Sequence, residues 1–494
     1  MEGLARVLLL DLLDGITPLR LAGDASVDVR ALEYDSRRVR PGACFACMPG
    51  DHTDGHAHAP AAVAAGAVAL LVERPLGLGV VEAQVPDVRR VLGPVASRIE
   101  GDPSRALRCI GVTGTNGKTT TTYLLHAIAA AAGERAGLIG TTGARVGDRV
   151  VPIGLTTPEA TDLQALLAGM RDEGVRTVAM EVSSHALAQH RVDGTWFAAA
   201  CFTNLSHDHL DYHGTLAAYF EAKASLFVPD RCGVAVTNLD DDHGRQIARR
   251  ARSVGLDVVT YARHEPTADV GVEDVRYGAH GTGFVLVDRR AGERHDAELA
   301  LLGPVNVWNA LAAAATARAL GEPLRVVARG LGDVPTVPGR LERIDAGQPF
   351  TVLVDYAHTP DALVHAMAAA RSLAGDRRVA VVFGCGGDRD SDKRPAMGAA
   401  AAAADLVVVT SDNPRSEDPA AIAAAAAAGV RSAGAEPVVE LDRRAAIDAA
   451  LAWAAGGDVV LVAGKGHESG QTVAGVTVPF DDRVVARELL EARS

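Results

Sequence analysis

The sequence predicts an α/β protein of three domains, each with a mainly parallel or mixed sheet. Short apolar runs, typical of buried strands, alternate with helical stretches along most of the chain, which indicates parallel sheets covered by helices on both faces. A length of 494 residues suits about three domains of ordinary size. Two linker-like segments, near 100–106 and 334–340, place the expected domains at 1–102, 103–336 and 337–494.

The composition is that of an ordinary globular protein, with 48% hydrophobic and 22% charged residues. The formal net charge is −13 and no Lys/Arg-rich block stands out, which argues against a nucleic-acid-binding or membrane-surface protein. The first residues contain only a short apolar run, broken by Asp11 and Asp14, and no stretch of about 18 uncharged apolar residues occurs in the chain. We therefore expect a cytoplasmic protein without a membrane span.

In the first section, the segment AAVAAGAVALLVE at 61–73 predicts a helix followed by a strand, and the section ends near the turn GDPSR at 101–105. Cys44 and Cys47 form the only close pair among the six cysteines. No second cysteine pair and no helix start accompany them, so alternation along a strand explains the pair better than a zinc or redox site.

The second section opens with a strand, a glycine-containing loop and a helix, in the segment RCIGVTGTNGKTTTTYLLHAIAAAAG that begins at Arg108. The glycines of the loop Gly114–Thr120 let backbone N–H groups approach phosphate oxygens, and the start of the helix adds a partial positive charge. Lys118 is placed to reach the β- and γ-phosphates, and the Thr119 hydroxyl to bind Mg²⁺. The standard template has a further glycine where Val112 stands, but the strand–loop–helix context is right. The loop therefore predicts binding of a nucleoside triphosphate.

The third section continues the alternation of strands and helices. Apolar strands are indicated in TVLVDYAHTP, RVAVVFGCGG, DLVVVTSDNPRSEDP, PVVELD and GDVVLVAGKGHE. The segment SDNPRSEDP at 411–419 reads as a turn, with one cation, Arg415, among prolines and acidic residues. Because it follows an apolar run, we expect it to be a loop at the carboxyl end of a buried strand.

Many short segments, in order along nearly the whole chain, resemble the Mur ligase superfamily, the ATP-dependent ligases that build the stem peptide of peptidoglycan. Within that superfamily the match is closest to the MurE type. The segments are DSRRVRPG, GTNGKTT, TTPEA, EVSSHALAQHR, FTNLSHDHLDYHG, YFEAKASLF, GPVNVWNALAA, VPGRLE, DYAHTPDAL, FGCGGDRD, KRP, DNPRSEDP and AGKGHE.

The resemblance implies a role for each domain. The small N-terminal domain would bind the UDP part of a UDP-muramoyl substrate, the central domain would be a P-loop ATPase domain, and the C-terminal domain would be Rossmann-like and bind an amino acid. In the implied reaction, ATP phosphorylates a carboxylate of UDP-N-acetylmuramoyl-L-alanyl-D-glutamate. The amine of meso-2,6-diaminopimelate then attacks the acyl-phosphate and expels phosphate. Such a transfer depends on concentrated positive charge more than on covalent help from the protein.

The resemblance also implies a catalytic set of Lys118, Glu181, His209 and Lys223. Thr119 and Glu181 would bind Mg²⁺, and His209 would help to hold a second Mg²⁺. CO₂ would convert Lys223 into an anionic carbamate able to bind Mg²⁺. From the residues alone, Lys223 would be interpreted as a solvated helical lysine and Glu181 as part of a surface ion pair. The ATP-binding residues would be Gly114, Thr115, Asn116, Gly117, Lys118, Thr119, Thr120, Asn306, Asn309, Arg340 and Asp355.

The cluster around His209 fits no structural zinc template, and no cysteine pair supports one. The resemblance implies that Asn204 and Asp208 shape this loop, whereas His207 and His213 would face solvent or support the site from behind.

A further set of residues matches contacts to the UDP-muramoyl dipeptide. Hydroxyl groups, an amide and an arginine suit a sugar and carboxylates. Leu155 stands where some relatives carry a polar residue, and DSRRVRPG alone could equally be a charged turn. The implied residues are Ser36, Asp51, His52, Thr53, Thr156, Thr157, Ser183, Gln189 and Arg191.

The loop with Arg415 matches the family signature for diaminopimelate. This amino acid differs from lysine by a carboxylate beside its far amine. The planar fork of Arg415 could bind that carboxylate, while Asp412 and Glu468 take the ammonium. Lysine would leave Arg415 unpaired, and such a site can reject the poorer analogue by about 10⁴-fold or more. Arg389 would bind the carboxylate of the reacting end. The implied diaminopimelate-binding residues are Arg389, Asp412, Asn413, Pro414, Arg415, Gly464 and Glu468.

Three alternatives remain: a lysine-adding ligase of the same type, a ligase similar to folylpolyglutamate synthase, and a P-loop ATPase that acts as a mechanical or regulatory module. The expected cofactors are ATP, Mg²⁺ and the carbamate on Lys223. The expected partners are small-molecule substrates, with neither nucleic acid nor membrane, and the expected state is a monomer.

Overall fold

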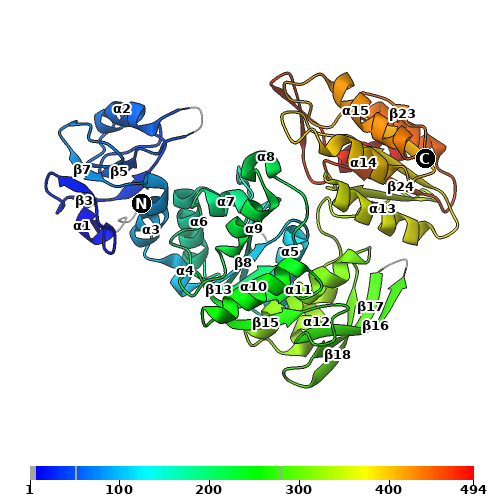
Figure 1. Ribbon diagram of the computed structural model, residues 1–494, viewed down its shortest axis with the longest axis horizontal. Helices are drawn as coiled ribbons and strands as arrows, with labels where there is room; N and C mark the ends of the chain where they lie inside the picture. The colour runs from blue at the N-terminus through cyan, green and yellow to red at the C-terminus, as the bar shows by residue number, and fades with distance from the viewer. Residues whose placement is uncertain (1–6, 51–52, 148, 279–280, 494) are drawn as a thin grey trace.

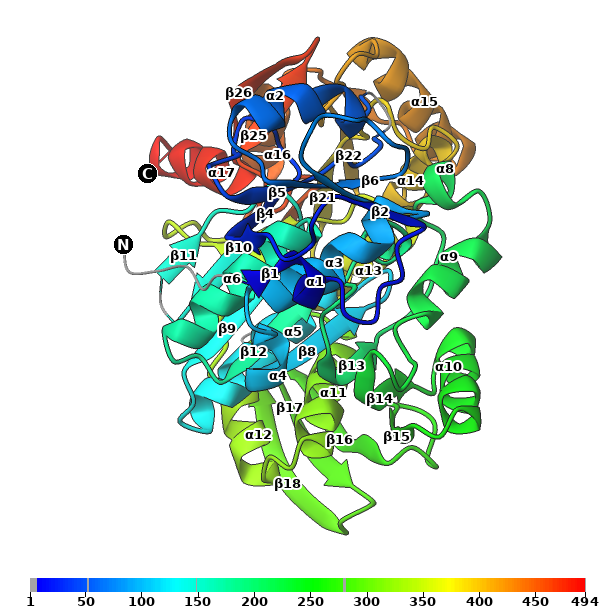
Figure 2. The same ribbon diagram turned by 90° about the vertical axis from the view of Figure 1, so that its left-hand side faces the viewer.

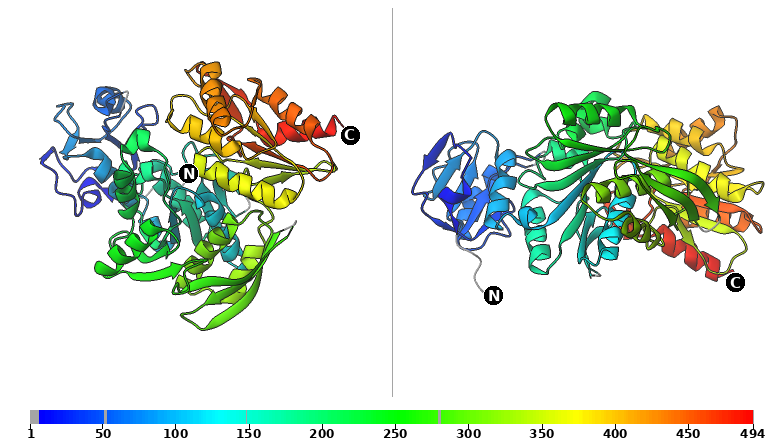
Figure 3. Two further views of the ribbon diagram at one scale, coloured as in Figure 1. Left: turned by 45° about the vertical axis from the view of Figure 1, so that its right-hand side comes forward. Right: turned by 90° about the horizontal axis from the view of Figure 1, so that it is seen from below.

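The computed structural model describes residues 7–50, 53–147, 149–278 and 281–493. Three large sheets organise this part of the chain, and Figure 1 shows them as three bodies joined through the central one. Seen from below, the bodies lie in a row in the order of the sequence (Figure 3). The predicted α/β class, with mainly parallel or mixed sheets, is confirmed.

The N-terminal body contains a five-stranded sheet in the order β2-β7-β6-β5-β4, in which only β2 is antiparallel to its neighbour. A separate pair, β1 and β3, lies beside it. Cys44 lies within β5, Cys47 directly follows it, and both thiols are buried and free. The elements are β1 (Val7–Leu8), α1 (Leu9–Leu12), β2 (Arg20–Ala22), β3 (Asp28–Val29), β4 (Ala31–Glu33), β5 (Ala43–Ala46), η1 (Gly55–His58), α2 (Ala59–Ala64), β6 (Ala69–Val72), β7 (Val81–Gln84) and α3 (Val88–Ile99).

The central body contains an eleven-stranded sheet in the order β11-β10-β9-β12-β8-β13-β14-β15-β16-β17-β18. Its strands are β8 (Arg108–Thr113), β9 (Ala136–Gly140), β10 (Gly143–Val146), β11 (Arg149–Val151), β12 (Thr177–Glu181), β13 (Phe197–Phe202), β14 (Cys232–Asn238), β15 (Asp257–Tyr261), β16 (Val270–Gly278), β17 (Gly281–Asp288) and β18 (Glu293–Leu299). Its helices are α4 (Pro103–Ala106), α5 (Lys118–Ala131), α6 (Ala160–Asp172), α7 (Ser184–Ala188), α8 (Leu210–His213), α9 (Leu216–Ala224), α10 (Asp242–Ser253), α11 (Val305–Ala319) and α12 (Leu324–Gly332).

Separate cores cover the two faces of this sheet. One core packs α5, α11 and α12 against one face, and the other packs α6, α9 and α10 against the opposite face. The alternation of strands and helices did not show that β16, β17 and β18 extend the sheet as an antiparallel meander. Figure 2 shows this extension projecting away from the other two bodies.

The C-terminal body contains a six-stranded sheet in the order β19-β20-β24-β21-β22-β23, parallel except for β19. Helices α13, α14 and α15 cover one face, and α16 and α17 cover the other. The elements are β19 (Glu342–Ile344), β20 (Thr351–Asp355), α13 (Pro360–Ala374), β21 (Val379–Phe383), α14 (Lys393–Ala401), β22 (Leu406–Val409), α15 (Pro419–Ser432), β23 (Val438–Val439), α16 (Arg443–Trp453), β24 (Val459–Ala463), β25 (Gly470–Val473), β26 (Val476–Pro479) and α17 (Asp482–Glu491).

The order of the parallel strands decides which loops meet. In the central sheet, β8 lies between β12 and β13, and Val112 pairs with Glu181 on one side and with Cys201 on the other. In the C-terminal sheet, β24 lies between β20 and β21, and β22 follows on the far side of β21. Ligands bind at the carboxyl ends of strands in folds of this kind, so these two sets of strand ends define where a site belongs.

The first two bodies meet where α3 passes the turn before β13. A side-chain carbon at Gly93 would overlap the carbonyl oxygen of Asp193, and one at Gly194 would overlap that of Gly93. The predicted domain limits at 102 and 336 fall in connections between the sheets and remain a prediction. None of the helices in the described residues combines the length and apolar character needed to span a bilayer.

We expect Gly93→Ala to destabilise the protein by about 1–3 kcal/mol, because its methyl group must displace backbone rather than a flexible side chain. The matched control is Gly169→Ala in α6, where nothing lies within 4 Å of the added carbon. That control should be neutral or stabilising by up to about 1 kcal/mol. Thermal unfolding measures both, and equal melting temperatures for the two variants would contradict the close approach at Gly93.

Candidate active site

The phosphate loop connects β8 to α5 and approaches the segment after β13 very closely. Gly114 and Gly117 both have positive φ, at 150° and 87°. A side-chain carbon at Gly114 would overlap the Thr203 hydroxyl, and one at Gly117 would overlap the amide oxygen of Asn309. Glycine is therefore required at both positions for space as well as for backbone conformation.

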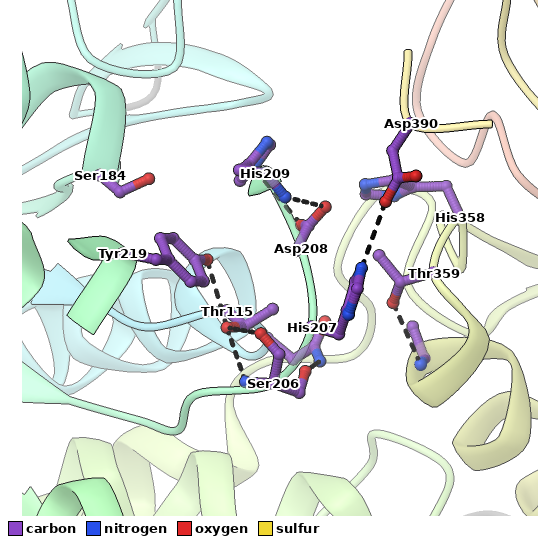
Figure 4. A network of polar contacts seen from close by, with 12 residues as sticks. Thr115, Ser184, Ser206, His207, Asp208, His209, Tyr219, His358, Thr359 and Asp390 are labelled. Carbon is purple, nitrogen blue, oxygen red and sulfur yellow. Dashed lines mark hydrogen bonds and ion pairs between the residues drawn. The ribbon is translucent and has the colours of Figure 1, made fainter. Parts of the chain in front are cut away.

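Hydrogen bonds attach the loop to residues 203–206. The backbone N–H groups of Thr115 and Asn116 donate to the main-chain and side-chain oxygens of Asn204, at 2.8 and 2.9 Å. Ser206 N–H donates to the Thr115 hydroxyl at 3.0 Å, and Tyr219 lies 3.2 Å from the same hydroxyl (Figure 4). Asn204 thus holds the phosphate loop. Thr115 and Asn116 therefore use their N–H groups internally, whereas the first turn of α5, from Lys118 onward, offers N–H groups that a phosphate can bind.

Two lysine side chains converge on one carbonyl oxygen of this loop. Lys118 Nζ donates to Gly114 O at 3.0 Å and to Thr115 O at 2.8 Å, and Lys223 Nζ donates to Gly114 O at 2.8 Å. Lys223 is only 1% exposed and lies 4.5 Å from the centre of the Tyr219 ring. Burial lowers the pKa of Lys118, against the effect of Glu181. Burial, followed by the charge on Lys118, lowers the pKa of Lys223 well below its ordinary value.

Glu181, the last residue of β12, is 1% exposed beside the phosphate loop. Its carboxylate accepts hydrogen bonds from the Thr141 N–H at 2.9 Å and from the Thr141 hydroxyl at 3.1 Å. Among the described residues, no lysine, arginine or histidine lies within ion-pair distance of it. A buried carboxylate without a paired cation suits a divalent metal ion.

His209 forms a cluster of aromatic rings with His185 and His213. His209 has a left-handed backbone with φ 53°, and its Nε2 lies 3.4 Å from an oxygen of Asp208. Its ring packs 4.8 Å from His185. Burial lowers the pKa of His209 to about 3, although Asp208 opposes this. His213 supports the cluster through a 3.0 Å contact with Ser184, so it does not simply face solvent.

A cavity of about 410 Å³ lies between the central and C-terminal bodies. Four of the predicted ATP-binding side chains line it together with the phosphate loop: Asn306, Asn309, Arg340 and Asp355. Sequence reasoning did not assign other residues of its lining, although Trp308 and Asp361 lie inside two of the family segments and Asp240 and Asp241 lie just after β14. The unassigned residues are Asp240, Asp241, Trp308, Asp361 and His365.

Arg340 links the two bodies at this cavity. Its Nη2 donates to the Thr119 hydroxyl at 2.9 Å, and its guanidinium lies 4.7 Å from the centre of the Tyr356 ring. Its Nε is buried and has no hydrogen-bond partner. Asp355 accepts the N–H groups of Leu341 and Ala357, which fixes the turn that carries Arg340. An unsatisfied guanidinium donor beside a helix start suits a phosphate oxygen.

Part of the predicted muramoyl-binding set lies near Glu181, in the segments around Thr157 and Arg191. Thr157 is fully buried, donates its hydroxyl to Glu181 O at 2.8 Å and accepts the Ser183 N–H at 3.1 Å, so it positions the strand end rather than facing a ligand. Arg191 pairs with Glu159 at 2.9 Å and donates to Gln189 at 2.6 Å.

Fewer contacts define the positions of the other predicted residues of this set. The Thr156 hydroxyl lies 3.3 Å from that of Thr141. Ser36 lies in the turn after β4, whose neighbour Arg38 binds Asp162 of α6 at 2.7 Å. Thr53 contacts His58 at 3.0 Å. Asp51 and His52 lie outside the described residues.

The loops after β21, β22 and β24 meet around Arg415. This residue has φ 53°, a conformation held by hydrogen bonds from its N–H to Thr472 O and to its own carbonyl from Ala474 N–H. One guanidinium nitrogen donates to Gly387 O at 2.6 Å. The fork is therefore oriented by the hairpin β25–β26 and by the loop after β21, while part of it stays free for an anion.

Asp412, Asn413 and Glu468 form the wall beside this arginine. Asn413 Nδ2 donates to Glu468 at 2.8 Å and to Asp412 at 3.1 Å. A side-chain carbon at Gly464 would come within 2.6 Å of Asp412, which explains the glycine. Arg389 is exposed on the loop between β21 and α14, next to Asp390, which lies 3.3 Å from His207 of the central body (Figure 4).

Three family descriptions match the chain: "Mur ligase family, catalytic domain" at 28–99, "Mur ligase middle domain" at 112–317 and "Mur ligase, glutamate ligase domain" at 339–466. A UDP-N-acetylmuramoyl-L-alanyl-D-glutamate–2,6-diaminopimelate ligase from Geobacillus kaustophilus is 46% identical over 94% of this chain and 96% of its own. The protein of the same name from Streptomyces coelicolor is 47% identical over 95% of this chain and 94% of its own.

Solved structures agree with these relatives. A structure titled with the same ligase name superposes with a TM-score of 0.72, at 36% identity and over 99% of each chain. A folylpolyglutamate synthase from Mycobacterium tuberculosis shares the fold at 23% identity, with a TM-score of 0.61, over 75% of this chain and 91% of its own. The matches cover the whole arrangement of sheets and loops described above, and the chain belongs to the Mur ligase family.

Proposed function

We propose that this protein is an ATP-dependent, ADP-forming ligase that adds meso-2,6-diaminopimelate to UDP-N-acetylmuramoyl-L-alanyl-D-glutamate in the synthesis of peptidoglycan precursors. The relatives that carry this name match nearly the full length of the chain. The single observation that supports it best is the pairing of a phosphate loop with a second strand-end site in which Arg415 is presented as an anion-binding fork.

The phosphate loop serves the first step, the transfer of the γ-phosphoryl group to the substrate carboxylate. The start of α5 and Lys118 bind the terminal phosphates, and the Arg340 guanidinium completes the positive charge from the other body. The substrate carboxylate attacks the γ-phosphorus, a new C–O–P linkage forms, and ADP leaves. The neutral amine of diaminopimelate then attacks the acyl carbon, the C–N bond forms, and the nitrogen releases a proton. Phosphate leaves with the bonding electrons of the C–O bond. Positioning the two substrates accounts for much of the rate.

Thr119, Glu181 and His209, with the modified Lys223, are the residues that we propose to hold Mg²⁺. When bound, the metal neutralises negative charge on the phosphate oxygens. Within the described residues, no three His, Cys, Asp or Glu side chains gather in an arrangement that could hold an ion by themselves. Further oxygen ligands must therefore come from the Thr119 hydroxyl, from phosphate and from another anionic group.

A carbamate on Lys223 supplies such a group. Only the neutral amine reacts with CO₂, and burial favours that neutral form. Lys223 Nζ donates to the carbonyl oxygen of Gly114, and the charge of Lys118 disfavours the ammonium more than the carboxylate of Asp208 favours it. A carbamate would instead place negative charge beside Lys118 and replace an unfavourable contact between two amines by an attractive one.

The remaining assignments follow the same arrangement. The domain at 1–102 would hold the UDP group, 103–336 the ATP, and 337–494 the diaminopimelate. Thr156, Ser183, Gln189 and Arg191 would contact the muramoyl dipeptide next to Glu181. We propose a cytoplasmic monomer, because ATP and UDP-linked sugars are cytoplasmic substrates and the two bodies of one chain already line the cavity.

A lysine-adding ligase is the alternative that the geometry disfavours. Arg415 is held in a strained left-handed conformation by two backbone hydrogen bonds, and only a substrate with a carboxylate at its far end would use its free donors. Phosphate release with the UDP-dipeptide and either diaminopimelate or lysine separates the two. Equal rates with lysine would contradict the specificity, and turnover with neither would contradict the function.

Arg415→Ala should reduce kcat/KM for diaminopimelate by about 10²-fold or more while leaving the KM for ATP within about twofold, because a buried charge-assisted pair is lost only at the far carboxylate. The control is Arg431→Ala, which removes an exposed pair with Glu436 in the same domain. A comparable rise in the KM for ATP would show that Arg415 acts on the fold rather than on the amino acid.

Lys223→Ala and Lys223→Arg should both abolish phosphate release, and added bicarbonate should restore neither. The arginine variant keeps a positive charge but forms no stable carbamate, so it separates the roles of charge and modification. Labelling with ¹³C-bicarbonate should give a carbamate carbon signal in the unmodified protein and none in the arginine variant. An active alanine variant, or an absent signal in a fully active protein, would rule out the carbamate.

A further inference from the structure

The chain contains only four lysines, Lys118, Lys223, Lys393 and Lys465, while its other permanently cationic side chains are arginines. Two of these lysines converge on the phosphate loop. Lys465, which directly follows Gly464 after β24, is also fully buried, at 0% exposure. None of the roles described above uses it.

Lys465 lies among the acidic side chains of the amino-acid pocket. Its Nζ is 3.2 Å from the side-chain oxygen of Asn413, 3.4 Å from an oxygen of Glu468 and 3.7 Å from an oxygen of Asp412. The ammonium therefore contacts all three side chains of the wall beside Arg415. Burial, followed by the nearby charge of Asp412, raises the pKa of Glu468, and Lys465 opposes this effect. The two carboxylates repel each other, and Lys465 is the cation between them.

We propose that Lys465 is a specificity-determining positioning residue, whose buried ammonium balances one of the two carboxylates so that the pocket prefers an amino acid with a zwitterionic far end over one with a cationic far end. The inference rests on the proposed function. It concerns how the same pocket selects its substrate.

The charges of the pocket carry the argument. With Lys465 present, the two carboxylates of Asp412 and Glu468 are matched by two cations, Lys465 between them and Arg415 on the loop that carries Asp412. Arg443 also acts on both carboxylates, but Asp482 balances its charge. The far end of diaminopimelate bears one ammonium and one carboxylate, so it adds no net charge to a balanced pocket. The far end of lysine adds one uncompensated positive charge. Removal of Lys465 would leave one negative charge in excess, and a cationic far end would then compensate it.

A different residue, Arg443, holds the backbone of the pocket, and its charge is balanced by its own partner, Asp482. Arg443, at 0% side-chain exposure, pairs with Asp482 through two hydrogen bonds of 2.7 Å. The same guanidinium donates to Ser411 O at 3.2 Å and to Ala463 O at 3.0 Å. These carbonyls directly precede Asp412 and Gly464. Arg443 thus fixes the ends of β22 and β24 through their backbone, whereas Lys465 contacts only the side chains of Asp412, Asn413 and Glu468.

The test compares kcat/KM for diaminopimelate with kcat/KM for lysine in four proteins: the unmodified enzyme, Lys465→Met, the double variant Lys465→Met/Glu468→Gln, and Arg378→Met. The double variant removes one charge of each sign, and glutamine keeps an oxygen to accept the Asn413 hydrogen bond. Arg378 serves as the matched control, because it pairs with the buried carboxylate of Asp458 at the opposite end of the same sheet.

Lys465→Met should lower the ratio of diaminopimelate to lysine by about tenfold or more, with the KM for ATP unchanged. The double variant should recover most of that ratio, and Arg378→Met should leave the ratio as it is while lowering stability. An unchanged ratio in Lys465→Met, or no recovery in the double variant, would overturn the proposal.

Two further outcomes are also decisive. If Lys465→Met does not fold, Glu468→Gln alone tests the same charge balance, and it should raise the ratio; a ratio that stays constant or falls contradicts the proposal. If the unmodified enzyme does not use diaminopimelate, the proposed function itself fails. If the unmodified enzyme uses diaminopimelate but the ratio of kcat/KM values does not change in the variants, only the proposed role of Lys465 is contradicted.

Discussion

The close contact between the phosphate loop and the segment after β13 is the constraint on which the rest of the site depends. The backbone of Gly114 lies against Thr203, so no side chain fits at this position. Its carbonyl oxygen accepts hydrogen bonds from both Lys118 and Lys223. Asn204 uses two N–H groups of the loop to hold it there. The result is a helix start, two amino groups and the carboxylate of Glu181 within one small volume, arranged before any substrate binds.

The C-terminal body solves a similar problem with different residues. Its loops carry buried charges, and several of these are matched from a distant part of the chain. Arg443 on α16 and Asp482 on α17 fix two strand ends, while Lys465 lies between the acidic side chains of the pocket. Arg340 joins this body to the first site through Thr119. ATP in the shared cavity would therefore contact both bodies, which couples nucleotide binding to the position of the amino-acid pocket.

Local patterns predicted the fold class and the phosphate loop because each depends on neighbouring residues. Glycine spacing and the strand–helix context identified Gly114–Thr120. The alternation of apolar strands with helices identified the parallel sheets. Lys223 could be assigned only by resemblance, since a lysine on a helix is ordinarily solvated. The sequence does not reveal that α9 buries this lysine against Gly114.

Other features depend on contacts between distant segments, and no local signal could have found them. Lys465 was missed although both Gly464 and Glu468 were predicted, because a lysine between two motif residues suggests exposure rather than burial. Trp308 lines the cavity from the face of a helix whose pattern indicates only core packing. Thr157 is the opposite case. It lies in a segment that resembles the family, but its hydroxyl hydrogen-bonds to the backbone of Glu181 and Ser183.

In the proposed reaction, ATP phosphorylates the substrate carboxylate before the amine attacks. Isotope transfer tests this most directly, with UDP-dipeptide labelled by ¹⁸O in the reacting carboxylate and mass analysis of the phosphate released in the presence of diaminopimelate. An acyl-phosphate intermediate predicts one ¹⁸O atom in each phosphate, because its C–O bond is the bond that breaks when the amine attacks. Unlabelled phosphate formed together with the tripeptide would contradict it.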